Sequence, residues 1–240
     1  MGLWDLFTNK KPSSEAIAKQ VQRAKEHYAQ PDYRRMAMDQ LLKWNTEESL
    51  RGILDRFCVV VQSPHWDEDE KKWLSEQIVA LGDKMKPILR NFILEKNEIN
   101  YALGAYRQIC KDDEEYNRLL IEALKKRPPS DHRSVQSKQE LLAALSELDL
   151  VSLEDLIAPY LNDHSDDVQF LSIEALSHSK SPHIHKLLLT MLSSENHSAR
   201  VVRAASAVVA QQKISLDPEL VLSDVVSEDY KIDHGLLVRR

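Results

Sequence analysis

Apolar residues recur along this chain with the spacing of an α-helix that buries one face. That spacing is i, i+3, i+4, i+7 and i+8. One such set is Ile184, Leu187, Leu188, Met191 and Leu192. Equivalent sets begin at Leu50, Met85, Tyr116, Leu153, Ile184 and Pro218, at spacings of 35, 31, 37, 31 and 34 residues. A repeat of this length predicts helix pairs that stack on one another rather than a single globule.

A second series of helical sets lies between these and carries smaller side chains. It is clearest in the sets that begin at Val168 and Val202. Weaker members begin near Tyr33, Leu74, Ile99 and Lys138, where at least one slot is polar. A large-residue helix that alternates with a small-residue helix lets the two approach closely. We therefore expect six antiparallel pairs.

Breaks between the sets give the domain organisation. We expect one solenoid domain over residues 1–240: a leader and capping helix in 1–30, the helix-pair array in 31–228 and a cap in 229–240. The extra helix is expected from about Ser14 to Gln30. A Pro-Pro pair follows Arg127, so an internal seam is predicted near 127–133. The triplet Asp233-His234-Gly235 separates two short apolar stretches and predicts a tight hairpin.

Two of the small-residue helices carry a family likeness. Asp166-Asp167-Val168-Gln169 is followed by Ser172 and Ala175-Leu176, and Val202-Arg203 is followed by Ser206. This pattern resembles the first helix of HEAT repeats over residues 165–212, and elsewhere the likeness is one of period alone. In that family the arginine and a preceding aspartate support packing between successive pairs. The resemblance thus implies a structural role for Arg203, and a phase that begins at Ala199-Arg200 is also open.

The resemblance and the periodicity together specify the expected fold. It is all-α: a right-handed α-α superhelix (armadillo-like) of about six antiparallel helix pairs, with an extra N-terminal helix and a short C-terminal hairpin-like cap. The chain also resembles bacterial HEAT-repeat proteins that open with an aromatic leader and close in a basic tail. The family implies a scaffold for proteins and no fixed chemistry.

Composition and charge narrow the function classes. Five glycines leave little turn material for a many-stranded β fold. The sequence has no apolar run close to the roughly 20 residues that span a bilayer, so we expect a soluble, cytoplasmic protein with no membrane partner. Charge is uneven, because residues 140–230 carry 5 Lys/Arg against 15 Asp/Glu. An acidic region repels phosphates, so nucleic-acid binding is disfavoured there and would have to use the N-terminal half. Cys58 and Cys110 fall on apolar faces and suit buried thiols.

Candidate chemistry is sparse. His178, His183 and His185 lie in one loop region and could take zinc, although solvated loop histidines are the simpler interpretation. The carboxylate runs Asp67–Glu70 and Asp112–Glu115 could hold a hard cation or act as acid/base pairs, but each precedes a helix and suits its positive dipole end. Phosphate loops and nucleophile elbows are absent from the sequence. We therefore expect no enzyme, no cofactor and no metal.

The remaining alternative is a nucleic-acid enzyme. Helical-repeat DNA glycosylases place aromatic residues and acids inside a basic groove, and Trp44, Trp66 and Trp73 lie near basic residues here. A catalytic aspartate does not stand out. In this alternative, nucleic acid would bind to the N-terminal half of the chain.

A binding surface follows from the expected architecture, in which the large-residue helices line the concave face. Slots beside their apolar stripe hold basic residues in the first pairs, and the fourth pair switches to Glu154 and Asp155. Our hypothesis is a non-catalytic protein–protein interaction scaffold that docks an acidic segment on a basic ridge. The ridge consists of Arg51, Arg56, Lys86, Arg90 and Arg118. The partner's identity and the oligomeric state do not follow from the sequence.

Overall fold

The computed structural model describes residues 11–146, 153–217 and 219–240. The chain forms two compact units, Met1–Leu119 and Leu120–Arg240, which divide within one helix, α7 (Asp113–Lys125). The predicted seam at 127–133 falls in the segment that follows this helix. Each unit is described by itself.

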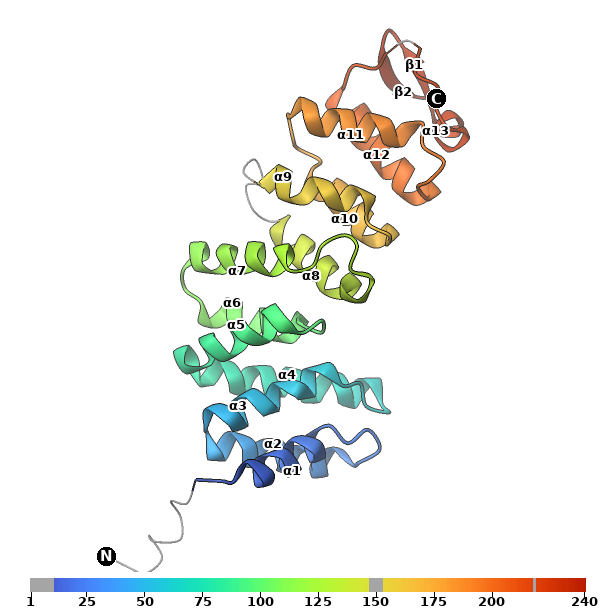
Figure 1. Cartoon of the computed structure of the whole chain (residues 1–240). Helices are drawn as coiled ribbons and strands as arrows, with labels where there is room; N and C mark the ends of the chain where they lie inside the picture. Colours follow the sequence, from blue (N-terminus) through green and yellow to red (C-terminus); the bar gives the residue numbers. More distant parts are fainter. Residues whose placement is uncertain (1–10, 147–152, 218) are drawn as a thin grey trace, which may run out of the picture. The chain divides into compact units, whose positions relative to one another are not determined.

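Short helices joined by short connections make up the first unit (Figure 1). Its elements before α7 are α1 (Ser14–Ala24), α2 (Pro31–Trp44), α3 (Glu47–Ile53), the 3₁₀ helix η1 (Leu54–Cys58), α4 (Pro64–Ala80), the 3₁₀ helix η2 (Gly82–Met85), α5 (Lys86–Glu95) and α6 (Asn100–Ile109). The extra N-terminal helix is thus confirmed, although it ends before the predicted Gln30.

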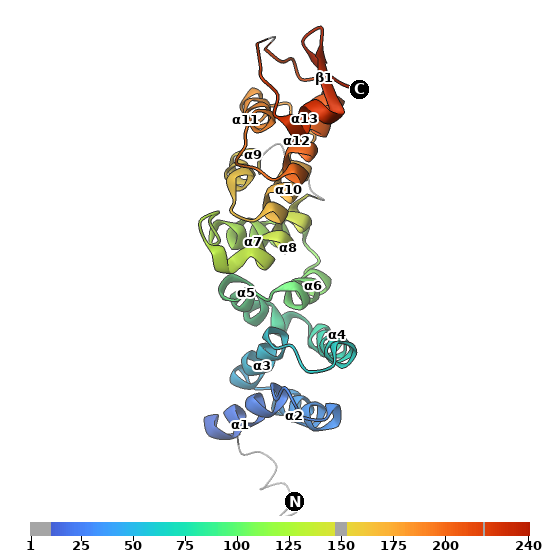
Figure 2. The ribbon, with the colours of Figure 1, turned by 90° about the vertical axis from the view of Figure 1, so that its right-hand side faces the viewer.

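Two layers of helices form this unit (Figure 2). Helices α1, α3 and α5 lie on one side, and α2, α4 and α6 lie on the other. The odd-numbered layer after α1 carries the predicted large-residue sets, and the residues of those sets are mostly buried, among them Leu50, Leu54, Ile88 and Leu89. Burial of these side chains, at roughly 1.5–3 kcal/mol each, drives the two layers together.

The helices begin where the sequence offers caps. Ser13, Thr46 and Ser63 each accept a hydrogen bond from a backbone N–H three residues later, at the starts of α1, α3 and α4. Pro31 and Pro64 occupy the first positions of α2 and α4, where a helix needs no N–H from its residue. Local sequence therefore fixes where α1, α2, α3 and α4 start.

The second unit repeats this arrangement with shorter elements. It contains η3 (His132–Ser134), α8 (Val135–Leu145), α9 (Glu154–Ile157), the 3₁₀ helix η5 (Ala158–Asn162), α10 (Asp166–Ala175), α11 (Pro182–Leu192), α12 (Ala199–Gln212), α13 (Asp224–Asp229) and the strands β1 (Tyr230–Asp233) and β2 (Leu236–Arg239). Helices α9 and α11 lie on one side of it, and α8, α10 and α12 lie on the other (Figure 2).

A buried ion pair occupies the slot that the pattern marks as polar in α8. The side chains of Lys138 and Asp163 are fully buried, with Nζ 2.5 Å from Oδ2. Lys138 also donates to the carbonyl oxygen of Asp131 at 3.1 Å. Asp163, directly after η5, is therefore the anion that allows Lys138 to be buried in the core.

Packing between α10 and α12 uses the alternative arginine. Arg200 of α12 pairs with Asp167 of α10, and its guanidinium lies 4.5 Å from the ring centroid of Phe170. Arg203 instead pairs with Glu228 and Asp229 at the end of α13, at 3.0 and 3.1 Å. Both arginines join helices, but Arg200 is the one that reaches back to an aspartate of the preceding small-residue helix.

The C-terminal end confirms one prediction and corrects another. The hairpin forms as expected: β1 and β2 pair antiparallel, and the turn residues His234 and Gly235 both have positive φ, at 48° and 74°. The helical set expected from Pro218 is wrong for most of its length, because the helix begins only at Asp224 and Val221 is 78% exposed. The amide of Leu216 donates to the carbonyl oxygen of Gly235 at 2.8 Å, so the segment after α12 is bound along the hairpin instead.

The described residues are mostly helical, which confirms the all-α class. Among the helices of this part of the chain, none combines the length and apolar character that crossing a bilayer requires.

Candidate functional site

Around α3 and η1, the first unit contains a network of buried charged residues. This network includes Arg56, which the sequence placed on the surface. Arg56 of the predicted ridge is fully buried. Its guanidinium turns toward α4 and donates to Asp67 Oδ1 at 2.8 Å and to Glu70 Oε2 at 2.9 Å. Arg56 therefore cannot contact a partner. It belongs to the interior.

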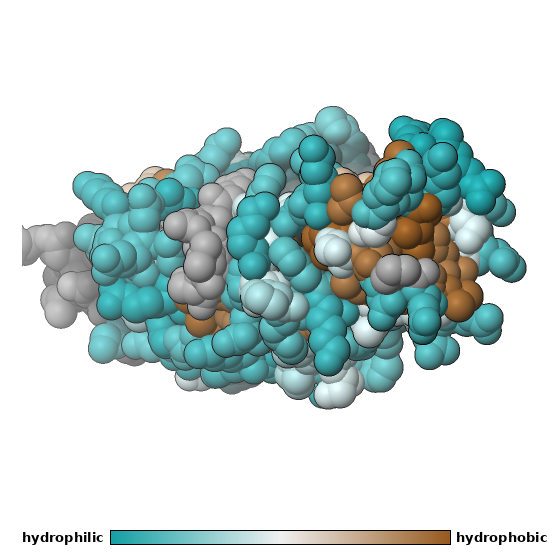
Figure 3. Space-filling view, turned by 90° about the horizontal axis from the view of Figure 1, so that it is seen from above, coloured by the Kyte–Doolittle hydropathy of each residue, from teal (hydrophilic) through white to brown (hydrophobic). Residues whose placement is uncertain are grey.

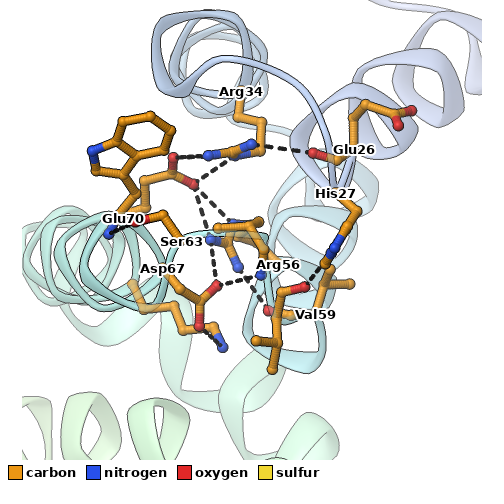
Figure 4. A network of polar contacts seen from close by, with 12 residues as sticks. Glu26, His27, Arg34, Arg56, Val59, Ser63, Asp67 and Glu70 are labelled. Carbon is orange, nitrogen blue, oxygen red and sulfur yellow. Dashed lines mark hydrogen bonds and ion pairs between the residues drawn. The ribbon is translucent and has the colours of Figure 1, made fainter.

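Glu70 joins three elements of the unit (Figure 4). Arg34 of α2 donates to both of its carboxylate oxygens, with Nη2 2.6 Å from Oε1 and Nε 2.9 Å from Oε2. Arg56 of η1 donates to Oε2 from the other side. Bidentate arginine–carboxylate contacts are the strongest of protein hydrogen bonds and also fix orientation. One carboxylate thus sets α2, η1 and α4 relative to one another.

Asp67 completes the network. It accepts from Arg56, from the amide of Val61 at 3.1 Å and from Lys71 Nζ at 2.8 Å. Burial raises the pKa of Asp67, but the hydrogen bonds from Lys71 and Arg56 lower the pKa by more, and it ends below its usual 3.8. We call Arg34, Arg56, Asp67, Glu70 and Lys71 the ionic network.

The ionic network has a structural role rather than a catalytic one. Its two carboxylates accept hydrogen bonds on all four oxygens, so neither holds an oxygen ready for a reacting group. The carboxylates of the run Asp67–Glu70 therefore divide between the surface and the core. Glu68 and Asp69 are exposed and pair along the helix with Lys72 and His65, whereas Asp67 and Glu70 enter the core. Helix-start electrostatics alone does not describe the run.

A groove lies on the other face of α3. It has a volume of about 450 Å³ and is lined by Ser14, Ile17, Ala18, Val21, Gln22 and Lys25 of α1 and the segment after it, Glu48, Arg51, Gly52 and Asp55 of α3 and η1, and Ile88, Asn91, Phe92, Glu95 and Lys96 of α5 and its end. We call this the α1–α3–α5 groove. Asp55 lines it, while the next residue, Arg56, points into the ionic network. The network therefore fixes the turn that presents Asp55.

Gly52 explains why the floor of this groove is low. A Cβ at position 52 would lie 2.5 Å from Cγ2 of Val21, a separation that real side chains do not tolerate. α3 therefore packs against α1 through its backbone, and it places no side chain from Gly52 between the two neighbouring helices. Ile17, Ile88 and Phe92 form apolar walls around this floor.

Charges along the groove are balanced and mostly paired. Asp55 lies between two lysines, with carboxylate oxygens 3.4 Å from Lys25 Nζ and 3.8 Å from Lys96 Nζ. At the other end Glu48 accepts from the hydroxyl of Ser14 at 3.1 Å. A lining that combines apolar residues with charges of both signs suits a peptide segment better than a phosphate backbone.

The other four residues of the predicted ridge remain at the surface of the odd-numbered helices. Arg51 lines the groove, is 66% exposed and pairs with Glu47. Lys86 is partly covered and lies 3.1 Å from Glu115, Arg90 is exposed on α5, and Arg118 of α7 is 72% exposed and lies 3.9 Å from Asp112. The sequence pattern missed the contributions of α1 and of Lys96. A mid-helix glycine at position 52 was the available signal for the floor.

The other candidate residues for metal binding or catalysis have less support from the structure. Among the described residues no three His, Cys, Asp or Glu side chains are placed to hold a metal ion. His178 and His183 are exposed, and His185 Nε2 lies 3.0 Å from the carbonyl oxygen of Ser179. Trp73, part of the alternative interpretation, lies under the guanidinium of Arg35, at 3.2 Å from the ring centroid. Burial, followed by the proximity of Glu98, raises the pKa of the Cys58 thiol to about 11, which disfavours a reactive thiolate.

A second surface lies at the hairpin end of the Leu120–Arg240 unit. Figure 3 shows hydrophobic residues gathered on this end. Val221 and Val238 are 78% and 39% exposed, and a shallow hollow nearby is lined by Tyr230, Leu236 and Val238. The charged residues that line this hollow, Lys213 and Arg239, are both cations, whereas the α1–α3–α5 groove carries charges of both signs. The groove is therefore the better-formed candidate site.

Comparison of the chain with protein-family models, with curated proteins and with solved structures finds no match.

Replacing Glu70 tests the ionic network. We expect Glu70→Gln to lower the free energy of unfolding by about 3–5 kcal/mol, because two buried arginines lose their shared anion. Urea unfolding followed by circular dichroism measures this. Glu68→Gln is the matched control, since it removes an exposed carboxylate from the same helix, and it should leave stability nearly unchanged. Equal effects of the two substitutions would contradict a structural role for the network.

Replacing Gly52 tests the floor of the groove. Alanine inside a helix normally stabilises by about 0.5–1 kcal/mol relative to glycine. Here we expect Gly52→Ala to destabilise by about 1–3 kcal/mol, because its Cβ would overlap Val21. Val21→Ala should remove the overlap, so the double variant should be more stable than the two single effects add up to. Additive effects in the urea-unfolding cycle would show that the close contact does not exist.

Proposed function

We propose that this protein is a non-catalytic interaction scaffold that binds a segment of another protein along the α1–α3–α5 face. The observation that carries the proposal is the groove itself: a hollow lined by apolar and charged residues of α1, α3, η1 and α5. A volume of about 450 Å³ falls within the range of roughly 300–1,000 Å³ that is usual for binding sites.

The proposed mode of recognition combines apolar anchors with charge. Ala18 and Val21, the more exposed apolar residues of the lining, would contact large apolar side chains of the partner beside the mostly buried Ile17, Ile88 and Phe92. Arg51, Arg90 and Arg118 would then meet acidic residues that flank those anchors, whereas the buried Arg56 takes no part in binding. Charges at a rim act on orientation and association rate more than on affinity.

We further propose that the helix pairs continue as a HEAT-like, right-handed superhelix. Support comes from the alternation of large-residue and small-residue helices, which is clearest in the second unit, and from the Arg200–Asp167 pair between α10 and α12. We also propose a cytoplasmic location, because the composition is that of a soluble protein. The nucleic-acid alternative gains no support from the groove, because its rim carries Glu48, Asp55 and Glu95 beside its three cations.

Charge reversal tests this proposal. We expect Arg90→Glu/Arg118→Glu to weaken partner binding by about tenfold or more, because like charges then face the acidic flanks of the partner. The measurement is quantitative affinity capture from lysate at physiological salt, followed by titration of each captured protein against purified wild type and variant.

Lys72→Glu/Arg107→Glu is the matched control. It reverses two exposed, ion-paired cations on α4 and α6, which belong to the opposite layer. Partner binding should survive this change. Loss of binding in both double variants, or in neither, would contradict docking on the odd-numbered helices.

A further inference from the structure

The α1–α3–α5 groove opens where the N-terminal segment of the chain enters the fold. The described chain begins at Lys11, and Ser14, the first residue of α1, already lines the groove. From there the groove follows one face of α1 down to Gln22 and continues to Lys25 beyond its end. Residues 1–10 are therefore tethered at one end of the groove.

The chemistry of residues 1–10 matches the groove walls. The sequence from Met1 to Lys10 carries four large apolar residues, Leu3, Trp4, Leu6 and Phe7. Leu3, Leu6 and Phe7 have the i, i+3, i+4 spacing of one helical face. An aromatic side chain such as Trp4 or Phe7 removes about 150–250 Å² from water when it is buried. Ala18, which is exposed, and Val21, which is partly exposed, offer these side chains an apolar surface on α1, beside the mostly buried Ile17, Ile88 and Phe92.

The length of the segment is sufficient. Ten residues span up to about 33 Å when extended, whereas the eleven residues of α1 rise about 16 Å. Pro12 and Ser13 separate the segment from α1, and the Ser13 side chain caps α1 by accepting from the amide of Ala16 at 3.2 Å. A chain that reverses at such residues can return along the helix it precedes.

We propose that Met1–Lys10 of the same chain docks in the α1–α3–α5 groove, with Trp4 and Phe7 as its anchors, and competes there with the partner segment. The docking stands on the groove and the tether alone, while the competition rests on the proposed function. Docking of this kind would shield the apolar walls until a partner with higher affinity displaces the segment.

Site-specific photo-crosslinking of the purified full-length protein tests the docking without any partner. The photo-reactive amino acid p-benzoylphenylalanine replaces Gln22, which is exposed and lines the groove, or Glu76, which is exposed on α4 in the opposite layer. After irradiation, mass spectrometry identifies the peptides joined to each position. We expect position 22, and not position 76, to capture peptides from residues 1–10.

Variants of the segment separate anchored docking from mere proximity. Trp4→Ser/Phe7→Ser should reduce capture at position 22 by about tenfold, the change that about 1.4 kcal/mol of lost docking free energy produces. Thr8→Ala/Asn9→Ala, a matched pair of polar positions in the same segment, should leave capture unchanged. Capture that ignores Trp4 and Phe7, or no capture of residues 1–10 at all, overturns the proposal.

A mixture of isotope-labelled and unlabelled protein identifies the chain that supplies the segment. We expect cross-links only within one isotopic form. Mixed cross-links would assign the groove to the N-terminal segment of a second copy and would overturn docking within one chain. Because this experiment contains no partner, its result is independent of the charge-reversal test of the scaffold.

Discussion

The first unit depends on one carboxylate that sits between two buried arginines. Glu70 receives Arg34 from α2 and Arg56 from η1, so it holds both layers of the unit at a single point. A buried charge is costly unless its hydrogen bonds are fully satisfied, and here they are. The cost of an imperfect arrangement makes the arrangement specific: other registers of α2, η1 and α4 would leave a guanidinium without its anion.

This constraint reaches the groove through two adjacent residues. Arg56 is held in the ionic network, and Asp55, one residue earlier, is thereby presented to Lys25 and Lys96 on the opposite face. Gly52 adds the second requirement, because its missing side chain lets α3 sit close to α1 and keeps the floor of the groove low. The interior of the unit thus shapes its surface.

Periodicity was enough to predict most helices, because burial of apolar side chains is what places them. It was not enough for the buried charges. Arg34, Arg56 and Lys138 occupy core positions, where a spacing rule counts them as polar interruptions, and their anions lie 36, 14 and 25 residues away. The prediction that Arg56 lies on the surface was wrong because it assumed α-helical geometry. A 3₁₀ helix turns once every three residues, so residue 56 falls beneath the buried Ile53 rather than beside it.

Hydrogen exchange shows whether the ionic network orders the α1–α3–α5 groove. Amide exchange of α3 and η1, measured by mass spectrometry in wild type, Glu70→Gln and Glu68→Gln, reports local opening of the groove floor. We expect Glu70→Gln to accelerate exchange first in residues 47–58, and we expect Glu68→Gln to leave exchange there unchanged. Exchange that speeds up equally across all helices of the unit, or only within α4, would contradict the claim that the network positions the groove.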